Sequence, residues 1–417
     1  MPIDNKLRMA MLSAHSCPVG KLGTKDTGGM SVYIRELAYE LGKQGHLVDI
    51  YTRVHDPKDR QIYELNQNAR LIHLKAGEDE EIHKLAVYSH IPDFACNLEN
   101  FRKHSKLHYD LIFSHYWLSA LAGVYLQQQW HVPHVTMFHT LGAVKNVIKE
   151  EACLKLDEDE LRLRIETEKN LVQRCHHIIA PTEREKEELI RYYDASSEKI
   201  GVVPCGVNLG KFKLLGKAQS RQYLGFGNDK IILFVGRIDP LKGIDKLIKA
   251  LPYLRNIQGL KLLIIGGGEH SQPEIDQLQR LSHNLEVQNS VNFLGLIKHG
   301  DLPYFYNAAD ACVLPSYHES FGLVALESLA CGTPVVATDT GDFKSIIKGG
   351  KTGYLVRDND PRHLADKIAL LLSRPCTDAK FSQLVRATVS SFSWSNIAET
   401  MIRDCQSVLA EYLTTVA

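Results

Sequence analysis

The feature that most constrains the fold is an alternation of short apolar runs with segments of helical spacing. At the start of the chain an apolar run spans Arg8–Ala14, a helical pattern spans Gly28–Leu41, and a second apolar run spans Leu47–Thr52. This order of strand, glycine loop, helix and strand is typical of a parallel βαβ unit, because two parallel strands need a crossover connection between them. We therefore expect a parallel sheet at the start of the chain.

The alternation continues along the chain and divides into two series. In the first series the further apolar runs are Leu111–Ser114, His134–Phe138 and His177–Ala180. In the second series the runs are Ile231–Val235, Leu262–Ile265, Val291–Leu294, Ala311–Leu314 and Pro334–Ala337. A turn-rich segment, Val202–Asn208, lies between them, and 417 residues suit two domains of roughly 200 residues each. We predict an α/β protein with two Rossmann-like, doubly wound domains facing each other across a cleft, at residues 1–205 and 206–394.

Composition disfavours several classes of protein. The 49 Lys and Arg residues balance the 49 Asp and Glu residues, so no net positive field gathers nucleic acid or an anionic membrane. The nine cysteines are scattered without a C-x-x-C pair, and we expect them to be reduced core residues. The sequence has no signal-peptide pattern and no uninterrupted apolar run of about 20 residues. We therefore expect a cytoplasmic protein without a transmembrane segment.

Motifs for other chemistries are missing or incomplete. No GxxxxGK[ST] phosphate loop occurs, and Gly266–Gly268 lacks a correctly spaced third glycine after it, which disfavours a kinase or a dinucleotide oxidoreductase. Cys175, His176 and His177 are adjacent on one element, so their side chains point in different directions. We expect no metal site and no required cofactor.

The segment Pro315–Val336 carries the strongest indication of a ligand site. The apolar pattern predicts a buried strand that ends at Pro315, and helical spacing follows it, so Ser320–Leu323 would form the first helical turn. Backbone N–H groups in a first turn have no intrahelical partner and can donate to phosphate oxygens. Glu319 would precede this turn, and Glu327 would lie about two turns into the helix.

Two other interpretations of this glutamate pair are available. Taken in isolation, Glu319 would be a helix-entry carboxylate and Glu327 an ordinary surface residue. The pair could also belong to a glycoside hydrolase, whose two carboxyls lie roughly 5–9.5 Å apart. Eight residues of helix rise roughly 12 Å, which disfavours the hydrolase.

Cations and glycines mark two further ligand positions. Arg237 and Lys242 follow the apolar run Ile231–Gly236, at a strand's carboxyl end, where open α/β sheets bind ligands. Arg offers a forked hydrogen-bond donor and Lys a point charge, so the two can neutralise a diphosphate leaving group. Their interaction with the diphosphate strengthens toward the transition state, because negative charge grows on the diphosphate as the glycosidic bond breaks. Gly28 and Gly29 precede a helix, so their backbone can approach phosphates or an acceptor closely. The alternative for Arg237 and Lys242 is that they are solvated surface cations, and the alternative for Gly28 and Gly29 is that they only form a turn.

Four sequence blocks together resemble one enzyme family along nearly the whole chain. HESFGLVALESLACGTPVVAT resembles the E-x7-E signature of the retaining, nucleotide-sugar-dependent glycosyltransferases of group 1 and family 4, which have the GT-B fold. Thr27–Tyr33 is similar to the glycine loop of that family, FVGRIDPLKGID to its phosphate-binding segment, and VVPCGVNLGKF to its interdomain junction. The resemblance implies that the final amphipathic helix, about 395–417, packs back against the first domain.

The resemblance also assigns roles on the donor side. It gives Glu319 the sugar hydroxyls and Glu327 the nucleotide ribose, and it places His139 against the donor sugar near the reacting carbon. His139, Arg237, Lys242 and Glu319 are the residues expected to carry the chemistry. The expected donor-binding residues are Gly28, Gly29, Arg237, Lys242, Ile297 through its backbone at the base, Glu319, the amides of Phe321, Gly322 and Leu323, and Glu327.

On the acceptor side, three segments resemble one branch of the family most closely. GGMSVYIRELAYELGKQGH, SHYWLSALAG and HTLGAVKN are similar to the branch with the inositol-phosphate N-acetylglucosaminyltransferase, and sucrose-phosphate synthase comes next. That branch holds a phosphate with a basic and hydroxyl cluster, whose matching positions are Lys84, Tyr116, Thr140 and Arg164. For Lys84 and Arg164, whose surroundings match less closely, an ordinary surface charge is the alternative.

These expectations combine into one activity. We expect metal-independent, retaining transfer of a sugar from a nucleoside diphosphate donor, a UDP-sugar first, to a small phosphorylated polyol or sugar such as inositol phosphate. No side-chain nucleophile suited to double displacement is evident, so we expect same-face attack with the diphosphate accepting the proton. A hexosyltransferase of the sucrose-phosphate synthase type, a lipid acceptor and a silent sugar-nucleotide binding protein remain alternatives. The donor base and sugar stay open, as does the oligomeric state, although relatives in this branch are often homodimers.

Overall fold

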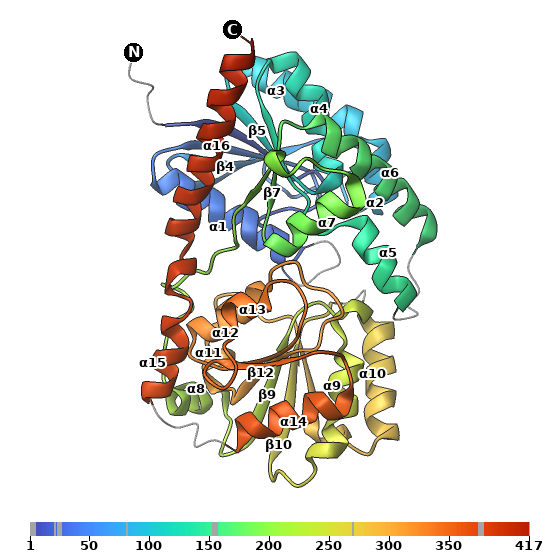
Figure 1. The fold of residues 1–417 in the computed structure, drawn as a ribbon, viewed down its shortest axis with the longest axis vertical. Helices are drawn as coiled ribbons and strands as arrows, with labels where there is room; N and C mark the ends of the chain where they lie inside the picture. Colours follow the sequence, from blue (N-terminus) through green and yellow to red (C-terminus); the bar gives the residue numbers. More distant parts are fainter. Residues whose placement is uncertain are drawn as a thin grey trace. The chain divides into compact units, whose positions relative to one another are not determined.

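The computed structural model of the chain describes residues 6–20, 22, 27–80, 82–151, 157–268, 271–373 and 379–416. The chain forms two compact units, each with its own sheet (Figure 1). The first unit comprises Met1–Gly20, Gly29–Pro204 and Trp394–Ala417, and the second comprises Lys21–Gly28 and Cys205–Ser393. Among the described residues no helix is long and apolar enough to cross a membrane.

The first unit is built on an eight-stranded sheet in the order β3-β4-β2-β1-β5-β6-β7-β8. Its strands are β1 (Arg8–Leu12), β2 (Leu47–Arg53), β3 (Ile62–Asn66), β4 (Ala69–Leu74), β5 (Leu111–His115), β6 (His134–Met137), β7 (His177–Ala180) and β8 (Ile200–Val202). Neighbouring strands pair in parallel except β3 and β4, which form an antiparallel hairpin at one edge. Its helices are α1 (Gly29–Lys43), α2 (Lys84–Ser89), α3 (Ile91–His104), α4 (Tyr116–Trp130), α5 (Gly142–Glu151), α6 (Glu158–Arg174), α7 (Glu183–Tyr193) and α16 (Trp394–Val416).

The second unit has a six-stranded sheet in the order β11-β10-β9-β12-β13-β14, with every pairing parallel. Its strands are β9 (Lys230–Val235), β10 (Leu260–Ile265), β11 (Val291–Gly295), β12 (Ala311–Leu314), β13 (Val335–Thr338) and β14 (Gly353–Val356). Its helices are α8 (Lys217–Leu224), α9 (Ile244–Ala250), α10 (Gln272–Asn284), α11 (Leu302–Ala308), α12 (Leu323–Ala330), α13 (Phe343–Ile346), α14 (Pro361–Leu372) and α15 (Ala379–Ala387).

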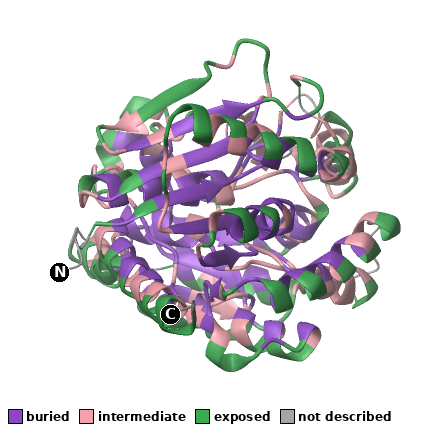
Figure 2. Ribbon diagram, turned by 90° about the horizontal axis from the view of Figure 1, so that it is seen from above, coloured by how far each residue is buried: buried purple, intermediate pink, exposed green. Residues whose placement is uncertain are grey.

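Each sheet is buried between its helices, as parallel sheets require. Figure 2 shows the strands largely buried, while the helices expose their outward faces. The last helix, α16, belongs to the first unit and packs along α1. There the Trp394 ring meets the edge of Tyr33 at 5.4 Å, and Asp404 pairs with His177 at 2.9 Å.

The apolar periodicity predicted the two-unit α/β fold correctly. Every predicted run became a strand of the expected sheet, with ends displaced by a few residues. Four strands were missed, namely β3, β4, β8 and β14. β3 is an exposed edge strand, β8 has only three residues, β14 begins with a glycine and is buried only at its two ends, and β4 interrupts its apolar residues with Arg70 and His73.

The cysteines lie mostly in the core, as expected. Those at 17, 175, 205, 312, 331 and 405 are buried free thiols. Cys96 is the exception, because it lies on the exposed face of α3. Cys153 and Cys376 lie outside the described residues.

Candidate active site

Three predicted site residues lie after strands at which the strand order of each sheet reverses. In the first sheet β1 and β5 are neighbours at this point, and in the second sheet β9 and β12 are. Connections leave such neighbouring strands toward opposite faces of the sheet, which opens a crevice at the carboxyl ends of the strands. Tyr116 follows β5, Arg237 follows β9, and Glu319 lies in the loop after β12.

All four residues predicted to hold an acceptor phosphate come together in the first unit. The Arg164 guanidinium is buried and lies 4.7 Å from the centre of the Tyr116 ring, while the Lys84 ammonium lies 6.0 Å from it. Arg164 donates to the Tyr116 hydroxyl at 3.1 Å and to the Thr140 hydroxyl at 3.0 Å. The sequence separations are 48 and 24 residues, so only the fold brings these groups together. Arg164 is therefore not the surface charge that its sequence context allowed.

A pair of histidines lies beside this cluster. Nδ1 of His115, at the end of β5, lies 3.0 Å from Nε2 of His139, and the Tyr33 ring contacts both. Desolvation lowers the pKa of His139 to about 3, and burial lowers the pKa of His115 well below its usual value. Both rings are therefore neutral at pH 7, and one N–H is shared between the two facing nitrogens.

Two of these residues adopt a backbone conformation that side chains other than glycine rarely take. Tyr116 has a φ of 75° and His139 a φ of 62°. Such positions store strain that the surrounding structure must hold in place, and they concentrate at functional sites. Both residues lie just after the carboxyl ends of β5 and β6, where a functional site is expected, so their strained backbone is consistent with a functional role.

In the second unit, the loops after β9 and β12 are joined to each other. The Lys242 ammonium contacts a Glu319 oxygen at 2.5 Å, and Ser316 donates to the same oxygen at 3.0 Å. The amide of Tyr317 donates to the carbonyl of Leu241, which ties the two loops by their backbones. Arg237 lies nearby in sequence, pairs with Asp239 at 3.5 Å, and has a side chain 39% exposed. The cation and carboxylate predicted for the donor site thus meet directly.

The helix after this loop starts later than predicted. α12 begins at Leu323 with Gly322 as its N-cap, so Ser320 and Phe321 precede the helix, and Glu327 lies about one turn into it. The estimate of a 12 Å helical rise between the two glutamates therefore does not apply. Gly322 has a φ of 93°, and an added Cβ would meet Phe343 at 2.2 Å. The glycine is thus required by its backbone conformation and by Phe343.

Glu327 is buried and held by two partners that the sequence did not suggest. Nε2 of His299 lies 2.8 Å from Oε1, and the Tyr306 hydroxyl donates to Oε2 at 2.8 Å. Burial and the neighbouring Glu327 carboxylate raise the pKa of Tyr306 well above its usual value, so the phenol remains a donor. Glu327 is therefore not an ordinary surface residue but the centre of a fixed polar group.

The remaining predicted residues occupy simpler positions. Gly29 begins α1, and Gly28 directly precedes it. Ile297 lies half-buried in the segment after β11. Phe321 is buried, and its ring lies 6.0 Å from that of Phe392. Leu323 is half-buried at the first position of α12.

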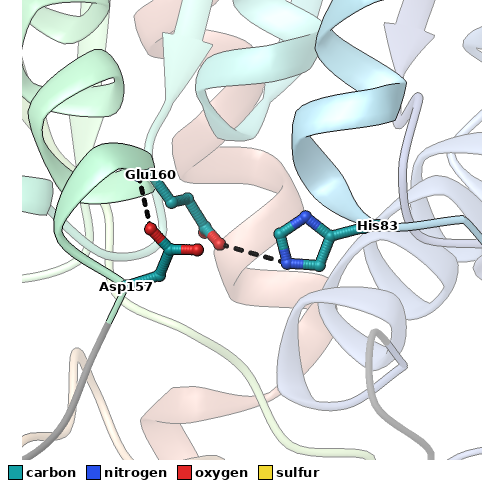
Figure 3. Close-up of side chains that lie close together, drawn as sticks. All are labelled: His83, Asp157 and Glu160. Carbon is teal, nitrogen blue, oxygen red and sulfur yellow. Dashed lines mark hydrogen bonds and ion pairs between the residues drawn. The ribbon is translucent and has the colours of Figure 1, made fainter.

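Figure 3 shows a possible metal-ligand group, formed by His83, Asp157 and Glu160. Nε2 of His83 lies 3.7 Å from Glu160, and its Nδ1 accepts from the amide of Leu85 at 3.4 Å. In a neutral imidazole this places the proton on Nε2, where a metal would need a lone pair. One Asp157 oxygen also accepts from the Glu160 amide, as the N-cap of α6. The geometry fits a helix cap and a longer contact between His83 and Glu160 better than a metal site.

The adjacent Cys175, His176 and His177 serve separate structural contacts. The Cys175 thiol is buried, and burial raises its pKa to about 12. Nδ1 of His176 accepts from the amide of His134, while His177 pairs with Asp404. The three side chains therefore do not converge.

Sequence reasoning missed five residues around the site. These are His15, His115, Glu168, His299 and Tyr306. Two of them had a readable signal, because His15 and His115 lie at or just after strand ends, and the His15 ring lies 4.3 Å from that of Tyr116. Glu168 follows Arg164 by one helical turn, a spacing at which charged side chains pair. His299 and Tyr306 had no such signal, because their link to Glu327 is tertiary.

Comparison with known proteins agrees with this architecture. Residues 27–211 match the family described as Glycosyltransferase Family 4, and residues 217–387 match Glycosyl transferases group 1. The D-inositol 3-phosphate glycosyltransferase of Corynebacterium glutamicum (strain R) is 35% identical over 94% of each chain. The corresponding protein of Corynebacterium jeikeium (strain K411) is 36% identical over 95% of each chain.

Two solved structures show the same fold. The sucrose-phosphate synthase of Thermosynechococcus elongatus superposes with a TM-score of 0.86 at 30% identity, covering 97% of this chain and 100% of that chain. Anabaena HepE in complex with UDP and glucose superposes with a TM-score of 0.74 at 18% identity, covering 96% and 100%. The two parallel-sheet units and these matches lead to one conclusion: the chain is a glycosyltransferase of group 1 and family 4, with the GT-B fold.

Proposed function

We propose that this glycosyltransferase moves a sugar from a nucleoside diphosphate donor to a small phosphorylated acceptor, with inositol phosphate as the first candidate. The observation that carries this proposal is the cluster of Lys84, Tyr116, Thr140 and Arg164, in which Tyr116 and Arg164 are buried and the other two are half-buried. Curated relatives that are 35% and 36% identical over nearly the whole chain, and are named inositol 3-phosphate glycosyltransferases, support the acceptor class.

The hydrogen-bond directions in this cluster favour an anion. Arg164 is a permanent donor, so the hydroxyls of Tyr116 and Thr140 must act as acceptors toward it. Each hydroxyl can then donate its own proton in a further hydrogen bond, and a phosphate oxygen is a suitable partner for that bond. Lys84 adds a second cation on the same Tyr116 ring. Lys84, together with the Arg164 guanidinium and two hydroxyls that keep a proton to donate, suits the phosphate of a monoester.

On the donor side, we assign Lys242 and Arg237 to the diphosphate and Glu319 to the sugar hydroxyls. Lys242 and Glu319 already form an ion pair, so each is oriented before the donor arrives. The N-terminus of α12 has no side-chain cap among the described residues, and its amides suit a phosphate. Each Glu327 oxygen accepts one bond and has a further lone pair for a ribose hydroxyl. A UDP-sugar is the first donor to test.

The proposed reaction retains configuration without a covalent enzyme intermediate. The bond between the sugar's C1 and the diphosphate oxygen breaks, and the acceptor oxygen bonds to C1 on the same face. The acceptor's proton passes to the departing diphosphate, whose negative charge Lys242 and Arg237 stabilise as it grows. The neutral His139 lies against the donor sugar. Trapping a covalent glycosyl adduct on Glu319 or another side chain would contradict this course.

A sugar phosphate is the second candidate acceptor. The structural similarity to sucrose-phosphate synthase, at 30% identity, supports it. The same phosphate cluster would serve both acceptors, since they differ in the hydroxyls presented rather than in the anchoring group. The choice therefore depends on contacts beyond the phosphate.

A transfer assay separates these candidates. UDP-, ADP- and GDP-sugars are each paired with inositol phosphate, fructose 6-phosphate and glycerol phosphate, and both thermal stabilisation and product are measured. We expect stabilisation by a UDP-sugar and transfer to inositol phosphate, unchanged by EDTA. Transfer to fructose 6-phosphate alone would favour the second candidate. Nucleotide binding without transfer to any acceptor would indicate a silent binding protein.

A further inference from the structure

The segment that carries His139 and Thr140 is held by a buried polar group on two other helices. This group consists of Arg164 and Glu168 on α6 and Tyr193 at the end of α7, and we call it the α6–α7 clamp. All three side chains are at most 2% exposed. Arg164 is shared with the proposed acceptor site, whereas Glu168 and Tyr193 are not among its proposed ligands.

Glu168 is the centre of the clamp. It accepts from Nε of Arg164 at 2.7 Å through Oε1, and from the Tyr193 hydroxyl and the Gly142 amide through Oε2, the latter at 2.8 Å. Burial and the Glu168 carboxylate raise the pKa of Tyr193 well above its usual value, so its hydroxyl stays protonated and donates. The carboxylate therefore fixes a cation, a phenol and a backbone amide at once.

The clamp bonds the 139–143 segment at three residues. Arg164 donates to both the carbonyl and the hydroxyl of Thr140, Glu168 accepts from the amide of Gly142, and the Tyr193 hydroxyl accepts from the amide of Ala143. Gly142 and Ala143 are the first two residues of α5, whose amides have no intrahelical partner. Glu168 and Tyr193 thus cap α5 from other parts of the fold.

The segment needs such support because it is strained at one end. His139 has a φ of 62°, and the segment between β6 and α5 is short. A strained conformation persists only where its surroundings determine it strongly. Close packing adds to the hydrogen bonds, since an added Cβ at Gly142 would meet Glu168 and Ile165 at 3.0 Å.

We propose that Glu168 and Tyr193 are positioning residues that hold Arg164 and the 139–143 segment in the geometry that binds the acceptor. This inference rests on the proposed function for the identity of the acceptor, but the clamp itself can be tested without it. Neither residue touches the substrate in this proposal. Both act through Arg164, Thr140 and the start of α5.

The sharpest variant is Tyr193→Phe, which removes one hydroxyl without changing charge or side-chain shape. We expect the Kd for inositol phosphate to rise about tenfold, while the Kd for UDP is unchanged because the proposed donor residues Lys242 and Glu319 belong to the other unit. Glu168→Gln should raise the Kd for inositol phosphate more than Tyr193→Phe does, because it leaves Arg164 buried beside a neutral partner. Tyr51→Phe is the matched control, since Tyr51 is equally buried and its hydroxyl bonds Tyr109 elsewhere in the unit.

Binding is measured by calorimetry on the full chain, and hydrogen exchange is followed in peptides that cover residues 140–145. Faster exchange in Tyr193→Phe than in Tyr51→Phe, with a selective loss of inositol phosphate binding, would support the proposal. Unchanged exchange and acceptor affinity, or an equal loss in Tyr51→Phe, would overturn it. If the wild-type chain binds no phosphate ester, the proposed function fails, and hydrogen exchange alone then decides whether the clamp holds the segment.

Discussion

Glu185 offers a sharp test of how burial controls the pH dependence of stability. It lies on α7, where its amide bonds the N-cap residue Thr182, and its side chain is 3% exposed. Within the described part of the chain, its Oε1 has no hydrogen-bond partner. Burial, with the carboxylates of Glu188 and Glu168, raises its pKa from 4.5 to about 8, and Arg164 opposes this shift.

The sign of the effect follows from proton linkage. The folded chain holds this proton more tightly than the unfolded chain, so the stability it contributes is complete below pH 4.5 and is lost as the pH rises through about 8. One pKa unit corresponds to about 1.4 kcal/mol, so the ionisation costs on the order of 3 kcal/mol at pH 7. Glu185→Gln removes this cost while it keeps the size of the side chain.

The assay is thermal unfolding of the wild type and of Glu185→Gln between pH 5 and pH 8. As the pH rises across this range, ionisation of Glu185 should lower the stability of the wild type. The Glu185→Gln variant should lose less stability, so the difference in stability between the two proteins should be larger at pH 8 than at pH 5. Glu187→Gln is the matched control, because Glu187 is exposed on the same helix and changes the net charge equally. If Glu185→Gln and Glu187→Gln have the same pH dependence as the wild type, the reasoning is refuted.

Three further predictions concern the second unit. Lys242→Ala should lower kcat on the order of 10²-fold with a smaller change in UDP affinity, because its charge stabilises the leaving group most in the transition state; unchanged turnover would remove it from the donor site. Glu327→Gln should weaken binding of UDP but not of inorganic diphosphate, measured by calorimetry, since only UDP carries a ribose; an equal effect on both would contradict the ribose assignment. Gly322→Ala should destabilise the protein by about 2–4 kcal/mol in thermal unfolding, because its φ is 93° and a Cβ would meet Phe343 at 2.2 Å, whereas Gly227→Ala, in open space, should not. Equal stability of the two glycine variants would show that Phe343 yields easily.

Local sequence patterns determined the fold class and the approximate location of the site. The apolar runs fixed which segments become parallel strands, because burial on both faces of a sheet demands continuous apolar residues. The positions of Arg237 and Glu319 followed, since residues after the carboxyl ends of such strands meet at one edge of the sheet. The family blocks then supplied roles that spacing alone does not give.

Only the tertiary structure decided which polar groups meet and where the site's helix begins. Arg164 reaches Tyr116 across 48 residues, and Lys242 reaches Glu319 across 77. Gly322 precedes α12 with a φ of 93°, and Phe343 occupies the space that a Cβ there would need, a contact that no local pattern encodes. The physical reason is that periodicity reports how each segment is buried, whereas a buried polar group is satisfied by whichever partner the packing of distant helices brings to it.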